Sequence, residues 1–201
     1  MRNAKDNANR RFIMVQIAEE LDETSAASKA GYSNLAVLSR DRIRRAEKSV
    51  TDGKPDLFHQ GPSGFRVLKI DSSNMKDVYY SPADTSQSML SGLVDNIKPD
   101  RTAEDLLFQV LLDCGVDLGL PIKSEKIDDC EVFFVNDSEH AAPDLVACFD
   151  PDVPESLVKT IAAKSPLRAV FRDQCFATDA DKINVEQIFK QLSPSTQLKS
   201  L

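Results

Sequence analysis

The sequence predicts an α/β protein, in which a strand–helix unit is followed by a small domain with a mixed sheet. Short apolar runs, typical of buried strands, alternate along the chain with stretches whose apolar residues recur every three or four positions, as in amphipathic helices. Of the 201 residues, 41% are apolar and 28% are charged, which is an ordinary globular balance. This length suits one domain or one and a half.

The first strand–helix pair is expected within the first fifty residues. Residues 11–17 form a nearly continuous apolar run, as in a strand that is buried on both faces of a parallel sheet. Residues 19–30 are polar and are expected to form a loop. Ser33 or Asn34 can then cap a helix, whose apolar stripe consists of Leu35, Leu38, Ile43, Ala46 and Val50.

A linker is expected next, because residues 51–64 contain three glycines and two prolines, which break regular structure. The predicted organisation is therefore a first part at residues 1–52, a linker at 53–64 and a compact domain at 65–201. We expect residues 1–50 to be loosely attached to this domain or to take part in oligomerisation.

The larger part begins with a strand at residues 65–70 and a turn at 71–74, whose short polar side chains can bond their own backbone. Two helices follow, one at about 84–97 and one that starts at Thr102 and stops at Gly115. The second has two acidic residues in its first turn, as helix starts favour.

The last eighty residues alternate between strands and helices. Residues 130–135 and 145–149 are apolar runs joined by a polar turn, which indicates a hairpin. A helix at about 154–164 leads to a strand at 167–171, and a strand–helix–strand unit predicts a parallel pair with a right-handed crossover. A final helix is expected at about 181–192.

Charge is distributed unevenly along the chain. Residues 1–50 hold ten Lys and Arg against seven acids, whereas the remaining 151 residues hold fifteen against twenty-five. Binding to phosphates needs clustered bases, so the acidic part should not bind DNA alone. Arg40, Arg44 and Lys48 lie four residues apart on one helix face; this row is either a solvated face, with Asp41 and Arg45 as an ion pair, or part of a DNA contact.

The sequence also indicates a soluble cytoplasmic protein with reduced thiols. No apolar run approaches the ~20 residues of a membrane span, and the N-terminal residues are too polar for a secretory signal. The four cysteines are at least sixteen positions apart and lie in or near apolar runs. This spacing excludes a zinc ribbon, and such cysteines usually act as small hydrophobic residues.

Few residues suggest chemistry. His59 and His140 are isolated in polar segments and are expected at the surface. Acidic residues follow two predicted parallel strands, namely Asp150 and Asp152 after one and Asp173, Asp179 and Asp181 after the other. Asp150, Asp173 and Asp181 could together hold Mg²⁺ for a hydrolase or phosphotransfer reaction; alternatively, Asp152 and Asp179 or Asp181 cap the helices that follow.

Four stretches, in order along nearly the whole chain, resemble one protein family. Residues 10–16 (Arg-Arg-Phe-Ile-Met-Val-Gln), with 42–46 (Arg-Ile-Arg-Arg-Ala), resemble the second strand and following helix of beta-class S-adenosylmethionine-dependent DNA methyltransferases. More narrowly, the chain is similar to the Mod subunit of type III restriction–modification systems, which methylates adenine at N6. The other matching stretches are residues 65–74, residues 105–112 with 118–122, and residues 176–177 with 182–190.

The resemblance implies a remnant strand–helix of a Rossmann-like methyltransferase domain, followed by a C-terminal association domain. The family's Asp-Pro-Pro-Tyr and glycine-loop motifs occur nowhere in the sequence; in family order they lie upstream of Arg11. Gln16 occupies the position at which related enzymes contact the cofactor's ribose, usually through a carboxylate. Gln16 is therefore either a cofactor contact or simply the end of a strand.

The expected function follows from the resemblance. The chain is similar to the C-terminal part of an adenine-N6 DNA methyltransferase, inactive alone and binding no S-adenosylmethionine by itself. The implied partners are another Mod subunit and the restriction subunit, and DNA only in the complete enzyme. The alternatives are a free-standing protein-interaction module and the Mg²⁺-dependent enzyme described above.

Overall fold

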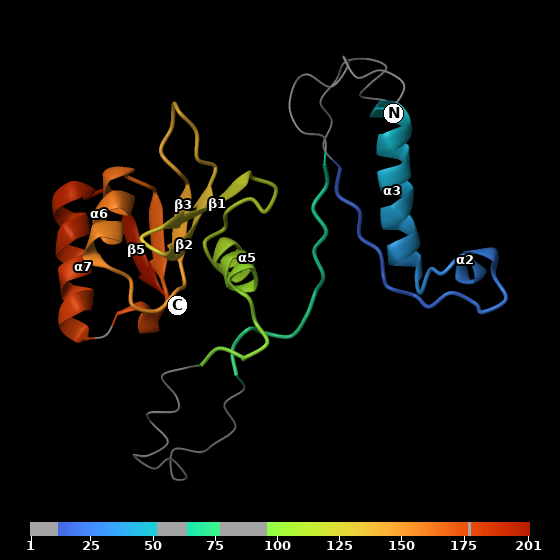
Figure 1. Cartoon of the computed structure of the whole chain (residues 1–201), viewed down its shortest axis with the longest axis horizontal. Coiled ribbons are helices and arrows are strands. Elements are labelled where there is room, and N and C mark those ends of the chain that lie inside the picture. Colours follow the sequence, from blue (N-terminus) through green and yellow to red (C-terminus); the bar gives the residue numbers. More distant parts are fainter. Residues whose placement is uncertain (1–11, 52–63, 77–95, 177) are drawn as a thin grey trace, which may run out of the picture. The chain divides into compact units, whose positions relative to one another are not determined.

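The computed structural model describes residues 12–51, 64–76, 96–176 and 178–201, which belong to two compact units, Met1–Leu68 and Lys69–Leu201 (Figure 1). The described residues form five α-helices and one five-stranded mixed sheet. The α/β class predicted from the sequence is therefore confirmed. Apart from Gly64, the predicted linker lies outside the described residues, as does most of the helix predicted at 84–97.

The first unit contains helix α3 (Leu35–Thr51). Asn34 caps it, because its Oδ1 accepts a hydrogen bond from the Val37 backbone N at 2.9 Å, as expected of an Asn N-cap. The predicted loop before it contains a short helix, α2 (Ala26–Lys29), whose N-cap Ser25 accepts from the Ser28 N. One isolated bridge, between Glu20 and Asn34, connects the loop to the start of α3.

The strand predicted at residues 11–17 is wrong for the described residues 12–17. They have no strand assignment, and Ile13 and Val15 are 94% and 90% exposed. An apolar run becomes a buried strand only where neighbouring strands accept its backbone hydrogen bonds, and none of the described residues of this unit provides such a strand. We call residues 12–17 the apolar segment.

The strand predicted at residues 65–70 is wrong for the same reason. These residues have no strand assignment, and Ile70 is 97% exposed. The turn predicted at 71–74 is present, with the Ser72 N donating to Asp71 Oδ1 at 2.7 Å. Beyond it, Met75 forms an isolated bridge with Ile97.

The sheet lies in the second unit, and its strands follow one another in sequence order. β1 (Ile122–Ile127), β2 (Cys130–Val135) and β3 (Leu145–Cys148) pair antiparallel, whereas β4 (Arg168–Phe171) and β5 (Gln197–Ser200) are added in parallel. The predicted hairpin and the predicted parallel pair are confirmed. β1 and β5 are additional, and they occupy the two edges.

Helices cover both faces of the sheet. α6 (Glu155–Ala163) and α7 (Asp179–Leu192) lie on one face and α5 (Ala103–Asp113) on the other (Figure 1). Side chains alternate along β2, so that Phe134 packs in the core with α6 and α7, whereas Phe133 packs in the core with α5. The three helices predicted here are confirmed, and two start with a complete capping box, at Thr102 with Asp105 and at Thr178 with Asp181.

Replacement of a core leucine in α5 tests this layering. Leu107 is fully buried and packs in the core between α5 and the sheet, so Leu107→Ala should lower the free energy of unfolding by about 2–5 kcal/mol. Leu112→Ala is the matched control, because Leu112 lies on the same helix but is 65% exposed; its effect should stay within about 0.5 kcal/mol. Urea denaturation measures both. Equal effects would contradict the placement of α5.

The capping box of α5 predicts an acid-sensitive step in stability. Hydrogen bonds from the backbone and side chain of Thr102 hold the pKa of Asp105 below its ordinary value of 3.8. A carboxyl with a lowered pKa stabilises the fold above its ordinary pKa, and this contribution is lost as the pH falls through the lowered value. Asp105→Asn should therefore lose less stability than the wild type on acidification below about pH 4.

Chemical denaturation at a series of pH values measures this difference. Asp113→Asn is the control, because it removes a carboxylate from the same helix without touching the cap. Identical acid dependence in Asp105→Asn and wild type would show that this carboxylate does not contribute through the cap.

Candidate functional site

The three carboxylates that could have formed a magnesium site lie in different surroundings. Asp150 Oδ2 accepts a hydrogen bond from the Glu131 backbone N at 2.6 Å, which ties the end of β3 to the start of β2. Asp173 Oδ2 accepts from Lys182 Nζ at 3.0 Å, and Asp181 belongs to the capping box of α7. Within the described part of the chain, no three acidic, Cys or His side chains form a group that could hold a metal ion.

The alternative role as helix caps is confirmed in part. Asp181 shares the capping box of α7 with the N-cap Thr178, whereas Asp179 is the first helical residue. Asp152 does not cap α6, because the N-cap there is Pro154, which makes no side-chain bond. Asp152 instead adopts a left-handed φ of 55° in the turn between β3 and α6, a conformation that Asp tolerates better than most residues.

Three cysteines lie close together in the core beneath α6 and α7. Cys130, Cys148 and Cys175 are buried, and Cys175 Sγ donates to the Cys148 carbonyl O at 3.6 Å. Burial raises the pKa of Cys148 and of Cys175 to about 12, and it also raises the pKa of Cys130. Neutral thiols are poor nucleophiles, so their predicted role as small hydrophobic residues is confirmed.

The remaining candidates that the structure describes are exposed. His140 lies at the surface in the turn between β2 and β3, whereas His59 lies outside the described residues. Gln16 lies in the apolar segment, where its Nε2 donates to the carbonyl O of Ile17 at 3.0 Å. Its contact with a cofactor stays a prediction.

A polar network connects the loop before α3 with the helix itself, and sequence analysis predicted only its ion pair. The hydroxyl of Tyr32 donates to Asp41 Oδ2 and accepts from Arg45 Nη2 at 2.7 Å. Arg45 Nε also lies 2.8 Å from Asp41 Oδ2, which is the predicted ion pair. The hydrogen bond from Tyr32 lowers the pKa of Asp41. Part of the charge on α3 therefore anchors the preceding loop, while Arg44 and Lys48 stay exposed.

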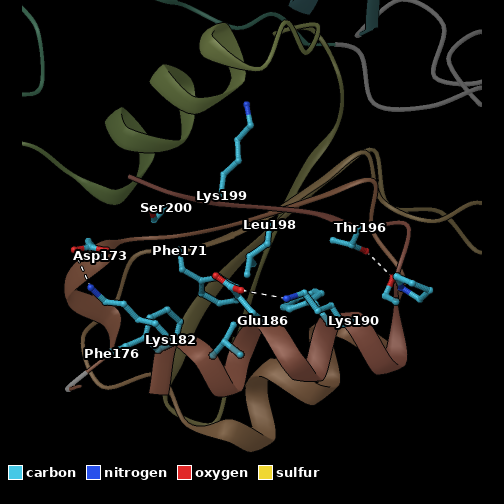
Figure 2. A pocket seen from close by; sticks show the side chains of 14 residues that line it. Phe171, Asp173, Phe176, Lys182, Glu186, Lys190, Thr196, Leu198, Lys199 and Ser200 are labelled. Atoms are coloured by element: carbon cyan, nitrogen blue, oxygen red, sulfur yellow. Dashed lines mark hydrogen bonds and ion pairs between the residues drawn. The ribbon is translucent and has the colours of Figure 1, made fainter. Parts of the chain in front are cut away.

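A groove of about 430 Å³ lies between α7 and the edge of the sheet (Figure 2). Phe171, Phe176, Phe189 and Leu198 give it an apolar lining, and the rings of Phe171 and Phe176 lie 5.5 Å apart. Lys182, Glu186 and Lys190 line it from successive turns of α7. Lys190 Nζ lies 3.4 Å from Glu186 Oε2.

One wall of this groove is an edge strand, whose outer side pairs with no strand of the described residues. β5 pairs with β4 on one side and is the last strand of the sheet. The backbone N of Gln197 donates to the Leu167 O at 2.9 Å, and that of Leu201 to the Phe171 O at 3.0 Å. Because backbone groups of successive strand residues point to opposite sides, those of Leu198 and Ser200 point to the open edge. We call this edge with its apolar lining the β5 groove.

A smaller cavity, of about 260 Å³, lies between the starts of α6 and α7 and has Asp152, Glu155 and Asp181 in its wall. Glu155 binds Lys159 at 2.5 Å and accepts from Asn184 Nδ2 at 3.1 Å. Because Asp181 caps α7, two of the three acids already serve the fold. Glu155 and Asp181 are thus engaged in bonds that hold α6 and α7, and we assign no chemical reaction to this cavity.

Comparison with known proteins finds neither a family model nor a curated protein that matches the chain. No helix among the described residues is long and apolar enough to cross a membrane. Functional inference therefore depends on the chain's own residues.

Thiol reactivity tests the burial of the cysteines. Cys114 is half-buried and lies 3.6 Å from Lys199 Nζ, so iodoacetamide at neutral pH should modify Cys114 first. Cys130, Cys148 and Cys175 should react only after unfolding, because they are buried and protonated. Mass spectrometry of the peptides gives the order. Rapid labelling of Cys148 in the native protein would contradict the described core.

Proposed function

We propose that the chain is the C-terminal part of a site-specific adenine-N6 DNA methyltransferase of a type III restriction–modification system, inactive alone and serving subunit association. The sequence resemblance, in four ordered stretches, supports the family. The association role is supported by one structural observation, the β5 groove, in which an apolar lining lies beside unpaired strand backbone. Such edges readily pair with another chain.

The proposed lack of activity follows from what methyl transfer requires. The target base must leave the DNA stack and be held in a pocket, and it must be aligned with the methyl donor. S-adenosylmethionine supplies the methyl group in this family, but the described residues do not fit a site for it. Gln16, the one predicted contact, is exposed in an unpaired segment and bonds its neighbour. The Asp-Pro-Pro-Tyr and glycine-loop strings are absent from the sequence.

A free-standing interaction module is the second candidate, because the same β5 groove could bind a partner outside any methyltransferase. The Mg²⁺-dependent enzyme is disfavoured by the separate bonds of Asp150, Asp173 and Asp181. The two remaining candidates differ in one respect. Only the methyltransferase fragment should restore methylation when it is combined with the missing motifs.

A complementation assay tests this difference. The chain should be mixed with a polypeptide that carries the glycine-loop and Asp-Pro-Pro-Tyr motifs of a type III Mod subunit, and transfer of labelled methyl groups to adenine should be measured. We expect methylation by the mixture and none by either part. Methylation by this chain alone would contradict its inactivity. Failure of the two parts to form an active complex would favour the free-standing module.

A further inference from the structure

Two exposed features of the described chain have complementary chemistry. The first is the apolar segment, in which five of the six side chains are large and hydrophobic and all of these are at least 60% exposed. The second is the β5 groove, which combines an apolar lining with an open strand edge. One supplies an extended apolar strand, and the other supplies backbone bonds and an apolar surface for it.

The alternation of the segment fits a strand added to a sheet edge. In an extended chain, Ile13, Val15 and Ile17 lie on one face and Phe12, Met14 and Gln16 on the other. The first set is β-branched throughout, which favours strand conformation. These three side chains could enter the groove over α7 while the segment's backbone pairs with that of Leu198 and Ser200. Figure 2 shows Leu198 and Phe171 extending from the sheet toward α7, with Lys199 pointing to the other face.

Charge bears on the direction of this match. The second unit is strongly acidic, with thirteen Lys and Arg against twenty-three acids in residues 69–201. The charges that face the groove are balanced, because Lys182 pairs with Asp173 and Lys190 with Glu186, whereas Lys199 points to the other face of the sheet (Figure 2). The apolar segment is followed by four acidic residues within six positions, Glu19, Glu20, Asp22 and Glu23. These acids are favoured beside a lysine of the groove and disfavoured beside its acids.

An antiparallel orientation puts these acids near a lysine. β5 starts beside Thr196, at the end of the groove where Lys190 lies, and it ends near Asp173, whose backbone N donates to the Leu201 O at 3.1 Å (Figure 2). A segment that runs antiparallel to β5 carries its acidic end toward Lys190 and away from Asp173. A parallel segment would do the reverse and bring acids toward Asp173 and Asp179, two carboxylates that share the single lysine Lys182.

The other edge of the sheet is less suited to receive a strand. β1 carries Lys123, Glu125 and Lys126 within its six residues, and Lys123 and Glu125 form an ion pair on it. Charged side chains on an edge strand discourage pairing with another chain. β5 has a single charged residue, Lys199. Of the two edge strands, β5 therefore has fewer charged side chains to discourage pairing with another chain.

We propose that the apolar segment of one chain adds as a strand antiparallel to β5 of a second copy, with Ile13, Val15 and Ile17 in the β5 groove. The proposal rests on the self-association part of the proposed function and specifies its contact. Two copies can exchange segments reciprocally, which gives a closed dimer with two equivalent contacts, the commonest form of homo-oligomer.

Two variants and a control test the contact in the whole chain. Ile13→Asp with Val15→Asp puts charges onto the apolar lining. Ser200→Pro removes an N–H that points to the open edge, where proline is tolerated, and it leaves the bonds of Gln197 and Leu201 to β4 in place. Ile70→Asp is the matched control, because Ile70 is an equally exposed apolar residue in another extended segment.

Sedimentation velocity at about 1–100 µM protein measures association over the range in which weak dimers form. We expect wild type and Ile70→Asp to be dimeric and both other variants to be monomeric, with circular dichroism and melting temperatures like those of the wild type. A mixture of the two monomeric variants should form a heterodimer through one intact contact, made by the segment of the Ser200→Pro chain in the groove of the other chain. Hydrogen exchange should show concentration-dependent protection of the amides of residues 13–17.

The remaining outcomes each overturn the proposal. A wild-type monomer with an unprotected segment shows that the groove does not take it, and a monomer with a protected segment shows docking within one chain. A dimer that survives Ser200→Pro but not the aspartate substitutions shows that segments pair with each other. Restored methylation in the complementation assay, with a wild type that stays monomeric, would leave the proposed function intact and reject this contact alone.

Discussion

The burial of the three central strands between two layers of helices is the constraint on which the rest of this structure depends. β2, β3 and β4 contact α5 on one face and α6 with α7 on the other, so almost every position along them must be apolar. Burial of this kind leaves no water for the backbone, and each strand therefore needs a hydrogen-bonded neighbour on both sides. The edge strands and the capped helix starts supply the remaining bonds. The three buried thiols fill space in the core, and that of Cys175 also donates to the Cys148 carbonyl O.

The same constraint explains which elements could be predicted from the sequence. Largely apolar runs identified β2, β3 and β4, and Thr102 with the acidic residues after it marked the start of α5. The last helix was expected from about residue 181, whereas α7 starts at Asp179. β1 and β5 are short and largely polar, with sequences Ile-Lys-Ser-Glu-Lys-Ile and Gln-Leu-Lys-Ser. They become strands because a buried neighbour requires a partner, which is information that lies elsewhere in the chain. Residues 12–17 show the converse, since their apolar pattern has no described neighbour to complete it.

Prediction of the candidate site was limited in a different way. The acidic residues after β3 and β4 were found easily, but their roles depend on bonds to distant residues, such as Asp150 with Glu131 and Asp173 with Lys182. Proximity of strand ends alone could not distinguish a shared ion site from separate structural bonds. The β5 groove carries no sequence motif, because its lining comes from β4, α7, β5 and the loop after β4. Residues 171 and 189 lie in a strand and a helix that were predicted, but β5 with Leu198 was not predicted, and the space between these elements is a property of the packed chain.

The order of the strands has a consequence for how this sheet is built during synthesis. Each strand pairs with the one that precedes it in the chain, and none is inserted between two others. The sheet can therefore be extended from one side as the polypeptide emerges from the ribosome. Each new strand then pairs with the strand that was synthesised before it. Such stepwise growth keeps the sequence separation between paired strands small, which favours rapid folding. It also means that β5 is the last of the five described strands to be synthesised, so a partner that joins at its edge meets the other four strands already made.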